Sequence, residues 1–198
     1  MTMLFSGGAV IDGDGNRLDG HAVLVAEERI ERVAPRAEFE GFAGKVVDTT
    51  GRTLLPGLVD CHVHLMLGGE GDPGSAADKM TPSALVMRAL RFAQTSLKAG
   101  VTGLRDCGGR DHLEFGVRDA CNRGEQLGPT IRAAGRMICM TGGHGNRYGR
   151  VADGVDEVVK AVREQVHAGC DLIKIMATGG VMTPGVNPED AHYSPEEI

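Results

Sequence analysis

A strand–loop–helix rhythm begins after Pro56 and repeats to the end of the sequence. Four apolar runs of strand length, "GLVDCHVHL", "VTGLRD", "TIRAAG" and "DLIKIM", alternate with segments whose apolar residues recur at helical spacing. Strands joined by helices form right-handed βαβ units and a parallel sheet. Strand interiors that are apolar nearly throughout fit a sheet covered on both faces. The sequence therefore predicts an α/β fold with four β/α units.

The ends of the predicted helices carry specific signals. Thr81 and Pro82 are typical of an N-cap followed by the first helical residue. Ser194 and Glu197 have the spacing of a capping box, which predicts that another helix opens there. Two further helices are predicted over "HLEFGVRDACNRG" and "VDEVVKAVREQVHAG".

The first 56 residues have a different pattern. Short alternating runs such as "HAVLVAEERIERVA" and "KVVDTTGRTLL" are broken by Gly and Asp turns. We expect residues 1–56 to form a small β unit of sandwich type, in a layer separate from the later strands. Residues 57–198 would then contain the four β/α units.

Four β/α units can form an open doubly wound sheet or half of an eight-fold (β/α)8 TIM barrel. No G-x-G-x-x-G follows the first strand, so the strongest marker of a dinucleotide-binding sheet is missing. The glycine-rich segments "CGGRD", "TGGHGN" and "ATGGVMTPG" all follow strands. In a barrel such loops form the C-terminal rim, where active sites lie. We therefore expect half of a TIM barrel.

The composition argues against several kinds of partner. The formal net charge is −6 and aromatic residues make up 4% of the chain, which indicates neither a phosphate-binding surface nor a base-stacking platform. The 5 cysteines lack framework spacing and fit reduced thiols. No secretory pattern and no run of about 18 apolar residues is present. We expect a cytoplasmic protein that binds neither nucleic acid nor membrane.

The strand "LLPGLVDCHVHL" ends in two histidines, which apolar strands ordinarily lack. Because side chains alternate along a strand, His62 and His64 share one face at its C-terminal end. Two neutral imidazoles placed in this way can bind one divalent metal. The alternative is a pair of partly exposed histidines bonded to the backbone. Asp106, at the end of "TGLRD", is expected to cap a helix or to orient a ligand.

Lys174 lies in the middle of the apolar run "DLIKIM". An unpaired buried ammonium is costly, so this residue must be paired, deprotonated or chemically modified. One interpretation is a structural lysine bonded to a nearby carboxylate. The other is a neutral amine, with its pKa lowered by burial beside a metal.

The motifs "LLPGLVDCHVHL", "AGVTGLRDCGG" and "GCDLIKIMATGG", in this order, resemble the metal-dependent amidohydrolase superfamily over essentially the whole chain. The likeness is greatest to its prolidase-like and Xaa-Arg-dipeptidase-like members, which are related to imidazolonepropionase. The resemblance implies that His62 and His64 bind the more buried of two zinc ions. It also implies that Lys174 is carboxylated and bridges the two ions, and that His144 in "TGGHGN" faces the substrate.

The superfamily pattern also requires histidines from the fifth and sixth strands and a general-base aspartate from the eighth. The four predicted units contain none of these, so no catalytic residue is assigned to this chain. His192 lies in a loop and is expected to be solvated. We expect the chain alone to be inactive and oligomeric or poorly soluble, with inward apolar residues such as Leu58, Val101 and Ile131 exposed unless a C-terminal half covers them.

In a complete enzyme, the resemblance implies metal-assisted hydrolysis of an amide bond in a small molecule, either a dipeptide or an N-acyl amino acid. A cyclic amide, as in imidazolonepropionase, is the alternative substrate. A further interpretation is not enzymatic. In that case the chain is an inactive fragment that associates with itself or completes a site with another polypeptide.

Overall fold

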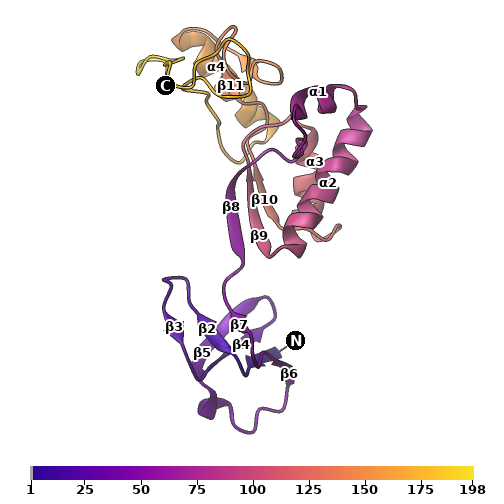
Figure 1. Ribbon diagram of the computed structural model, residues 1–198, viewed down its shortest axis with the longest axis vertical. Coiled ribbons are helices and arrows are strands. Elements are labelled where there is room, and N and C mark those ends of the chain that lie inside the picture. Colours follow the sequence, from indigo (N-terminus) through magenta and orange to yellow (C-terminus); the bar gives the residue numbers. More distant parts are fainter. Residues whose placement is uncertain (1) are drawn as a thin grey trace. The chain divides into compact units, whose positions relative to one another are not determined.

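The computed structural model describes residues 2–198, which form two compact units, Met1–Gly57 and Leu58–Ile198 (Figure 1). The first unit holds two small sheets. The larger sheet has the strand order β5-β4-β1-β6, and only its β1–β6 pair is parallel. Its strands are β1 (Thr2–Ser6), β4 (His21–Ala26), β5 (Arg29–Pro35) and β6 (Lys45–Asp48). The smaller sheet, ordered β3-β2-β7, consists of β2 (Ala9–Ile11), β3 (Arg17–Leu18) and β7 (Thr53–Leu54), and a 3-10 helix, η1 (Arg36–Phe39), follows β5.

The second unit is built on a parallel sheet with the order β10-β9-β8. Two helices connect β8 to β9 and one connects β9 to β10, so both crossovers are helical, as the sequence predicted. Helices α2 and α3 pack against each other and against the strands, on one side of the sheet in Figure 1. The elements are β8 (Leu58–Val63), α1 (Pro73–Asp78), α2 (Pro82–Lys98), β9 (Val101–Asp106), α3 (Leu113–Asn122) and β10 (Thr130–Ala133).

The main core of this unit lies between α2, α3 and the sheet. The side chain of Thr81 caps α2 by accepting a backbone hydrogen bond, as predicted. Leu85 and Ala89 on the buried face of α2 pack with Leu104 of β9 and Ile131 of β10. Ile131 is 0% exposed, so the expectation that it would face inward and be left exposed is wrong: its side chain points into the helix-covered core.

The expected exposure is found instead at Leu58, at the edge of the sheet. β8 is an edge strand, and Leu58 and Val59 are 53% and 66% exposed. Neither sheet of the first unit includes β8. The described part of the chain is therefore a mixed α/β structure with one face of its parallel sheet covered by helices.

The remainder of the second unit is less regular. It contains β11 (Ile138–Cys139), β12 (Arg150–Val151) and α4 (Val155–Ala168), and β11 pairs in parallel with β12. The predicted helix after Ser194 forms only a turn. Glu197 does accept the expected hydrogen bond from the Ser194 amide (2.8 Å), and it also accepts one from the Gly154 amide (2.9 Å).

The predicted strand "DLIKIM" is wrong as a full strand. It pairs with β11 through one parallel bridge, between Ile138 and Ile175. The Ile138 amide donates to the Lys174 carbonyl (2.8 Å), and the Met176 amide donates to the Ile138 carbonyl (2.9 Å). The neighbouring segment between β10 and β11 turns at Gly135, where φ is +75°. This turn interrupts the ladder that a full strand would need.

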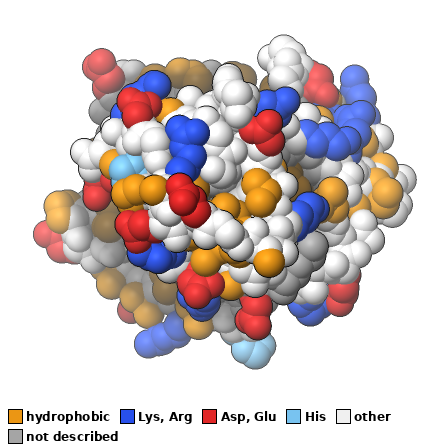
Figure 2. Space-filling model, turned by 90° about the horizontal axis from the view of Figure 1, so that it is seen from below, with side chains coloured by type: hydrophobic (Ala, Val, Ile, Leu, Met, Phe, Trp, Pro, Cys, Tyr) orange, Lys and Arg blue, Asp and Glu red, His pale blue; other side chains and the backbone are white. Residues whose placement is uncertain are grey.

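The surface carries mixed charge. On the face shown in Figure 2, acidic and basic side chains are interspersed with apolar ones. Among residues 2–198, no helix combines the length and apolar character needed to cross a bilayer.

Candidate metal centre and adjacent pocket

The two histidines of the first parallel strand lie at its carboxyl end, on the same side. The ring centroids of His62 and His64 are 5.5 Å apart, with the rings inclined at 62°. His62 is exposed, whereas His64 is half-buried. The pKa of His62 is lowered, first by burial of part of the ring and then by the positive charge of Lys174. A lowered pKa favours the neutral imidazole, which is the form that binds metals.

His64 is held in a defined orientation. Its Nδ1 lies 2.8 Å from the carbonyl oxygen of Gly108. Because a carbonyl can only accept, Nδ1 carries the hydrogen and Nε2 keeps its lone pair. An imidazole that donates one ring nitrogen to the backbone presents the other as a ligand, as in many metal sites.

Asp106, at the end of β9, organises the backbone around His64. Its buried carboxylate accepts hydrogen bonds from the amides of Leu65 (2.7 Å) and Gly108 (2.8 Å). Leu65 follows His64 in the sequence, and Gly108 is the residue whose carbonyl oxygen orients the His64 ring. Burial raises the pKa of Asp106, and the two amides oppose that shift. Asp106 thus fixes the backbone next to His64, and its expected role in orienting a metal ligand stays a prediction.

A second buried carboxyl lies beside Asp106. Glu114 of α3 is 0% exposed, and within residues 2–198 neither of its oxygens has a hydrogen-bond partner. Burial, and then the charge of Asp106, raises the pKa of Glu114 to about 8. Glu114 is therefore protonated at neutral pH and sits directly against Gly109, where a Cβ would lie 2.3 Å from its carboxyl oxygen. Helical periodicity in "HLEFGVRDACNRG" gave no sign that this carboxyl would be buried.

Lys174 lies just before the bridge at Ile175 and is half-buried. After burial, its positive charge contributes to the lowered pKa values of His62 and His144, and it opposes the burial that raises the pKa of Cys107. No ion pair involves Lys174 within residues 2–198. The interpretation of Lys174 as a structural lysine with a carboxylate partner is therefore not supported.

The donors present fit a metal site that this chain only partly supplies. His62 and His64 provide two neutral nitrogen donors, and a carboxylated Lys174 would add oxygen donors. Within residues 2–198, no group of three or more His, Cys, Asp or Glu side chains has the geometry to hold a metal.

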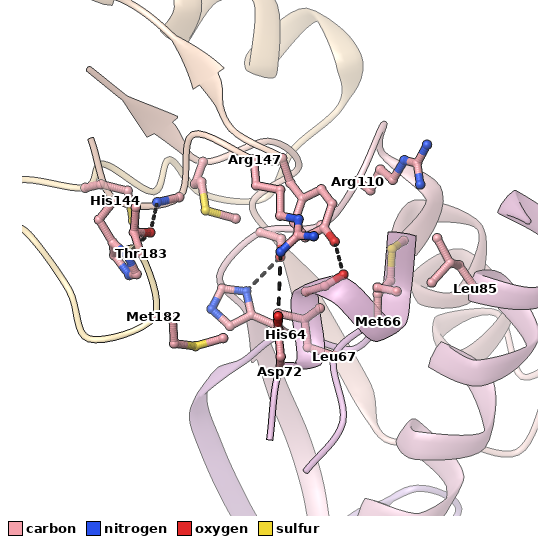
Figure 3. A pocket seen from close by; sticks show the side chains of 18 residues that line it. His64, Met66, Leu67, Asp72, Leu85, Arg110, His144, Arg147, Met182 and Thr183 are labelled. Atoms are coloured by element: carbon pink, nitrogen blue, oxygen red, sulfur yellow. Dashed lines mark hydrogen bonds and ion pairs between the residues drawn. The ribbon is translucent and has the colours of Figure 1, made fainter. Parts of the chain in front are cut away.

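His144 lies in the loop after β11 and, with His64, lines the same pocket (Figure 3). Its Nδ1 is 2.9 Å from the hydroxyl of Thr183, and its ring lies against Gly180. Burial lowers the pKa of His144, followed by the charges of His192, His64 and Lys174. The structure thus brings His144 into the same neighbourhood as the predicted metal ligands.

The expectation that His192 is solvated is wrong. It is 8% exposed, and its Nδ1 has no hydrogen-bond partner within residues 2–198. A Cβ on Gly143 would lie 3.0 Å from that nitrogen. The loop folds back because Thr178 and Ala191 form an antiparallel bridge, a contact for which the sequence carries no local signal.

The pocket next to His64 is a cavity of about 100 Å³. Methionines from three segments line it, together with Leu67, Ala77 and Leu85. Charged side chains also reach it. Arg147 pairs with Asp78, 2.5 Å from Nη2 to Oδ2, and its Nη1 lies 3.8 Å from Asp72.

Comparison with known proteins establishes the class to which this α/β chain belongs. The model of the amidohydrolase family matches residues 53–198, which is more than half of the chain. The chain therefore belongs to the amidohydrolase family.

Individual relatives fall in several branches of that family. Ochratoxinase of Aspergillus niger is 32% identical over 230 aligned residues, covering 100% of this chain and 46% of the relative. Imidazolonepropionase of Chromobacterium violaceum is 50% identical over 54 residues, which is 26% of this chain and 13% of the relative.

Solved structures match over the whole chain. A Xaa-Pro dipeptidase with methionine bound in the active site has a TM-score of 0.89 at 28% identity. A prolidase complexed with N-methylphosphonate-L-proline has a TM-score of 0.86 at 31% identity. Each match covers 100% of this chain and 52% of the solved chain, so the chain spans about half the length of these relatives.

Proposed function

We propose that this chain supplies the metal-binding side of the active site of an amide-bond hydrolase that acts on dipeptides or N-acyl amino acids. The observation that carries the proposal is the histidine pair at the end of β8. His64 has its Nδ1 committed to the Gly108 carbonyl and its Nε2 free, with Lys174 close by. Membership of the amidohydrolase family and the likeness to a prolidase and a Xaa-Pro dipeptidase support it.

In this proposal the second unit is the first half of a TIM barrel, and the first unit is a β-sandwich layer. His62, His64 and the carbamate of Lys174 hold two divalent ions, zinc in the first instance. When bound, these ions activate a water molecule and polarise the amide carbonyl of the substrate.

The side chains of this chain then have separate tasks. Asp106 fixes the amides of Leu65 and Gly108, which keeps the His64 ring in place. Lys174 must lose its proton before its amine can react with carbon dioxide, and no carboxylate of the described residues is paired with it to hold the ammonium form. His144 is the substrate-binding residue: its Nδ1 is engaged with Thr183, which leaves Nε2 to contact the substrate.

The complete activity requires polypeptide beyond these 198 residues, including the general base. The 46% and 52% coverage of the relatives supports this division. The chain alone is inactive, and it associates with a complementing C-terminal half or with itself. The protein acts in the cytoplasm on a small molecule, without nucleic acid or membrane.

The imidazolonepropionase relatives support a second candidate, hydrolysis of a cyclic amide. The 50% identity over 54 residues is the highest among the relatives described above, but it covers only 26% of this chain. The non-enzymatic alternative predicts no turnover of either substrate class by the complete protein. Assays of dipeptide cleavage and of ring opening by that protein separate the three.

The carbamate of Lys174 is the sharpest test on this chain itself. In ¹³C-bicarbonate with added zinc, we expect a carbamate resonance that is lost in Lys174→Arg and kept in Lys98→Arg, a control at an exposed lysine on α2. A resonance that persists in Lys174→Arg, or that never forms in the unsubstituted chain, would contradict the assignment of this lysine.

A further inference from the structure

The pocket beside His64 has walls with an unusual composition. Four methionines from three segments line it: Met66, Met137, and Met176 and Met182 of the irregular segment that follows α4. Met66 and Met137 are only 3% and 4% exposed, so they form its inner wall. Methionine is unbranched and polarisable, and it adapts to ligands of irregular apolar shape.

The charged groups that line the pocket already have ion-pair partners, which for Arg110 is Asp111 (3.4 Å). Arg147 is shared between Asp78 and Asp72, and it also donates to the Ser75 hydroxyl (3.3 Å). The Tyr148 hydroxyl oxygen lies 2.7 Å from both the Gly74 carbonyl oxygen and an Asp78 carboxylate oxygen, which share its one hydrogen. Burial, and then the bond to Asp78, raises the pKa of Tyr148 to about 12, so it carries no charge at neutral pH. A charged substrate group would therefore have to compete with an existing ion pair.

Figure 3 shows how this arrangement meets the candidate metal centre. His64 lies at the middle of the pocket, with Met182 and His144 on one side and Met66 and Leu85 on the other. A substrate whose amide lies at His64 would therefore place an adjoining group against the methionine wall.

We propose that this pocket is the specificity site of the protein and that it takes an uncharged, apolar side chain or acyl group of aliphatic size. The inference rests on the proposed function for the position of the scissile amide, but the binding itself needs neither metal nor turnover. The size follows from the cavity volume of about 100 Å³, which is below the ~150 Å³ of an apolar cavity that accepts benzene. A leucine or methionine side chain fits this limit better than phenylalanine.

The test uses the whole chain labelled with ¹³C at the methionine methyl groups. It is titrated with the N-acetyl amides of leucine, phenylalanine, lysine and glutamate, with and without zinc. We expect saturable shifts of the four pocket methyl groups, with leucine amide binding at least tenfold more tightly than the two charged amides, since a charged group loses hydration on entering an apolar pocket. Met87, 64% exposed on α2 and outside the pocket, is the internal reference.

Two substitutions make the result specific. Met182→Ala removes a pocket wall at a side chain that is 55% exposed, so folding is preserved, and it should shift the preference toward phenylalanine amide. Met87→Ala should leave the preference unchanged. Equal binding of the charged amides, shifts at Met87 as large as those in the pocket, or an unaltered preference in Met182→Ala would each overturn the assignment. Pocket shifts that persist while the carbamate and hydrolysis tests fail would contradict the proposed function and leave this inference intact.

Discussion

The second unit contains two regions built in different ways. From Leu58 to Ala133, parallel strands and helices share one core, in which Leu85, Ala89 and Ile131 are 0% exposed. Residues 134–198, the less regular region, contain two-residue strands and one helix, and a smaller core around Ile138 and Ala161. The first region supplies His62, His64 and Asp106, and the second supplies Lys174 and His144. The proposed site residues of the first region therefore lie at the ends of regular strands, whereas those of the second lie outside helices and strands.

The largest expected effect concerns Glu114, the buried carboxyl of the region from Leu58 to Ala133, which we call the layered region. The folded-state pKa of Glu114, about 8, lies above its ordinary value of 4.5. The protonated form thus favours the fold below about pH 4.5, and this stabilisation is lost as pH rises through 8. The difference between these two pKa values corresponds to at most about 5 kcal/mol in the free energy of unfolding, at about 1.4 kcal/mol per pKa unit.

Glu114→Gln should therefore flatten the fall in the free energy of unfolding between pH 5 and 8, measured by urea denaturation. Glu164→Gln is the matched control in the less regular region. Glu164 is exposed and its pKa is lowered by Arg150, so its removal should leave that fall in place. An unchanged slope in Glu114→Gln would show that Glu114 is ionised in the folded protein.

The next largest effect is expected when a core side chain of the layered region is shortened. Ile131→Ala is expected to lower the free energy of unfolding by about 2–5 kcal/mol, since the site is closed by the helices and cannot collapse fully. Val166→Ala, at a position 61% exposed on α4, should change it by less than about 0.5 kcal/mol. Chemical denaturation measures both, and comparable losses would argue against the packing described here.

Loss of the Asp106 carboxylate, which fixes the backbone around His64, should lower the affinity for metal. Asp106→Asn keeps the size of the side chain but replaces one carboxylate oxygen with an amide nitrogen, which cannot accept from a backbone amide. We expect zinc affinity to fall by about 10–100-fold, the usual effect of losing a residue that orients a ligand. Competition with a chromophoric chelator measures the change. Asp153→Asn, which alters a carboxylate bonded to Thr141, should leave zinc affinity unchanged.

The smallest effect is expected in the less regular region. The Tyr193 hydroxyl donates to the Ala152 carbonyl at 2.8 Å, in the core of that region. Tyr193→Phe should lower the free energy of unfolding by about 1 kcal/mol, because it removes one buried hydrogen bond and leaves the ring packed. A loss above about 3 kcal/mol would show that this region depends on single bonds more strongly than we infer.

The same contrast explains what the sequence could predict. In the layered region, the apolar spacing after Thr81 and the strand-length runs that contain Leu104 and Ile131 report burial directly, so the helix, the strands and their order were predictable. The alternation of side chains placed His62 and His64 on one face. Their environment was less accessible, because the bond from His64 to Gly108 joins residues 44 positions apart.

Errors are concentrated where local pattern does not determine structure. The run around Lys174 has strand composition, yet the turn at Gly135 leaves it a single bridge. Nothing near His192 signals that its loop folds back, and nothing near Glu114 distinguishes a buried carboxyl from a surface one. These outcomes depend on contacts between distant segments, which a single sequence does not display.

The central claim is that His62 and His64 together bind a metal ion. Zinc retained after dialysis of the purified chain, measured by elemental analysis, tests it most directly. We expect bound zinc in the unsubstituted chain and in His167→Ala, an exposed control on α4, and we expect its loss in both His62→Ala and His64→Ala. Equal zinc retention in all four proteins would contradict the claim.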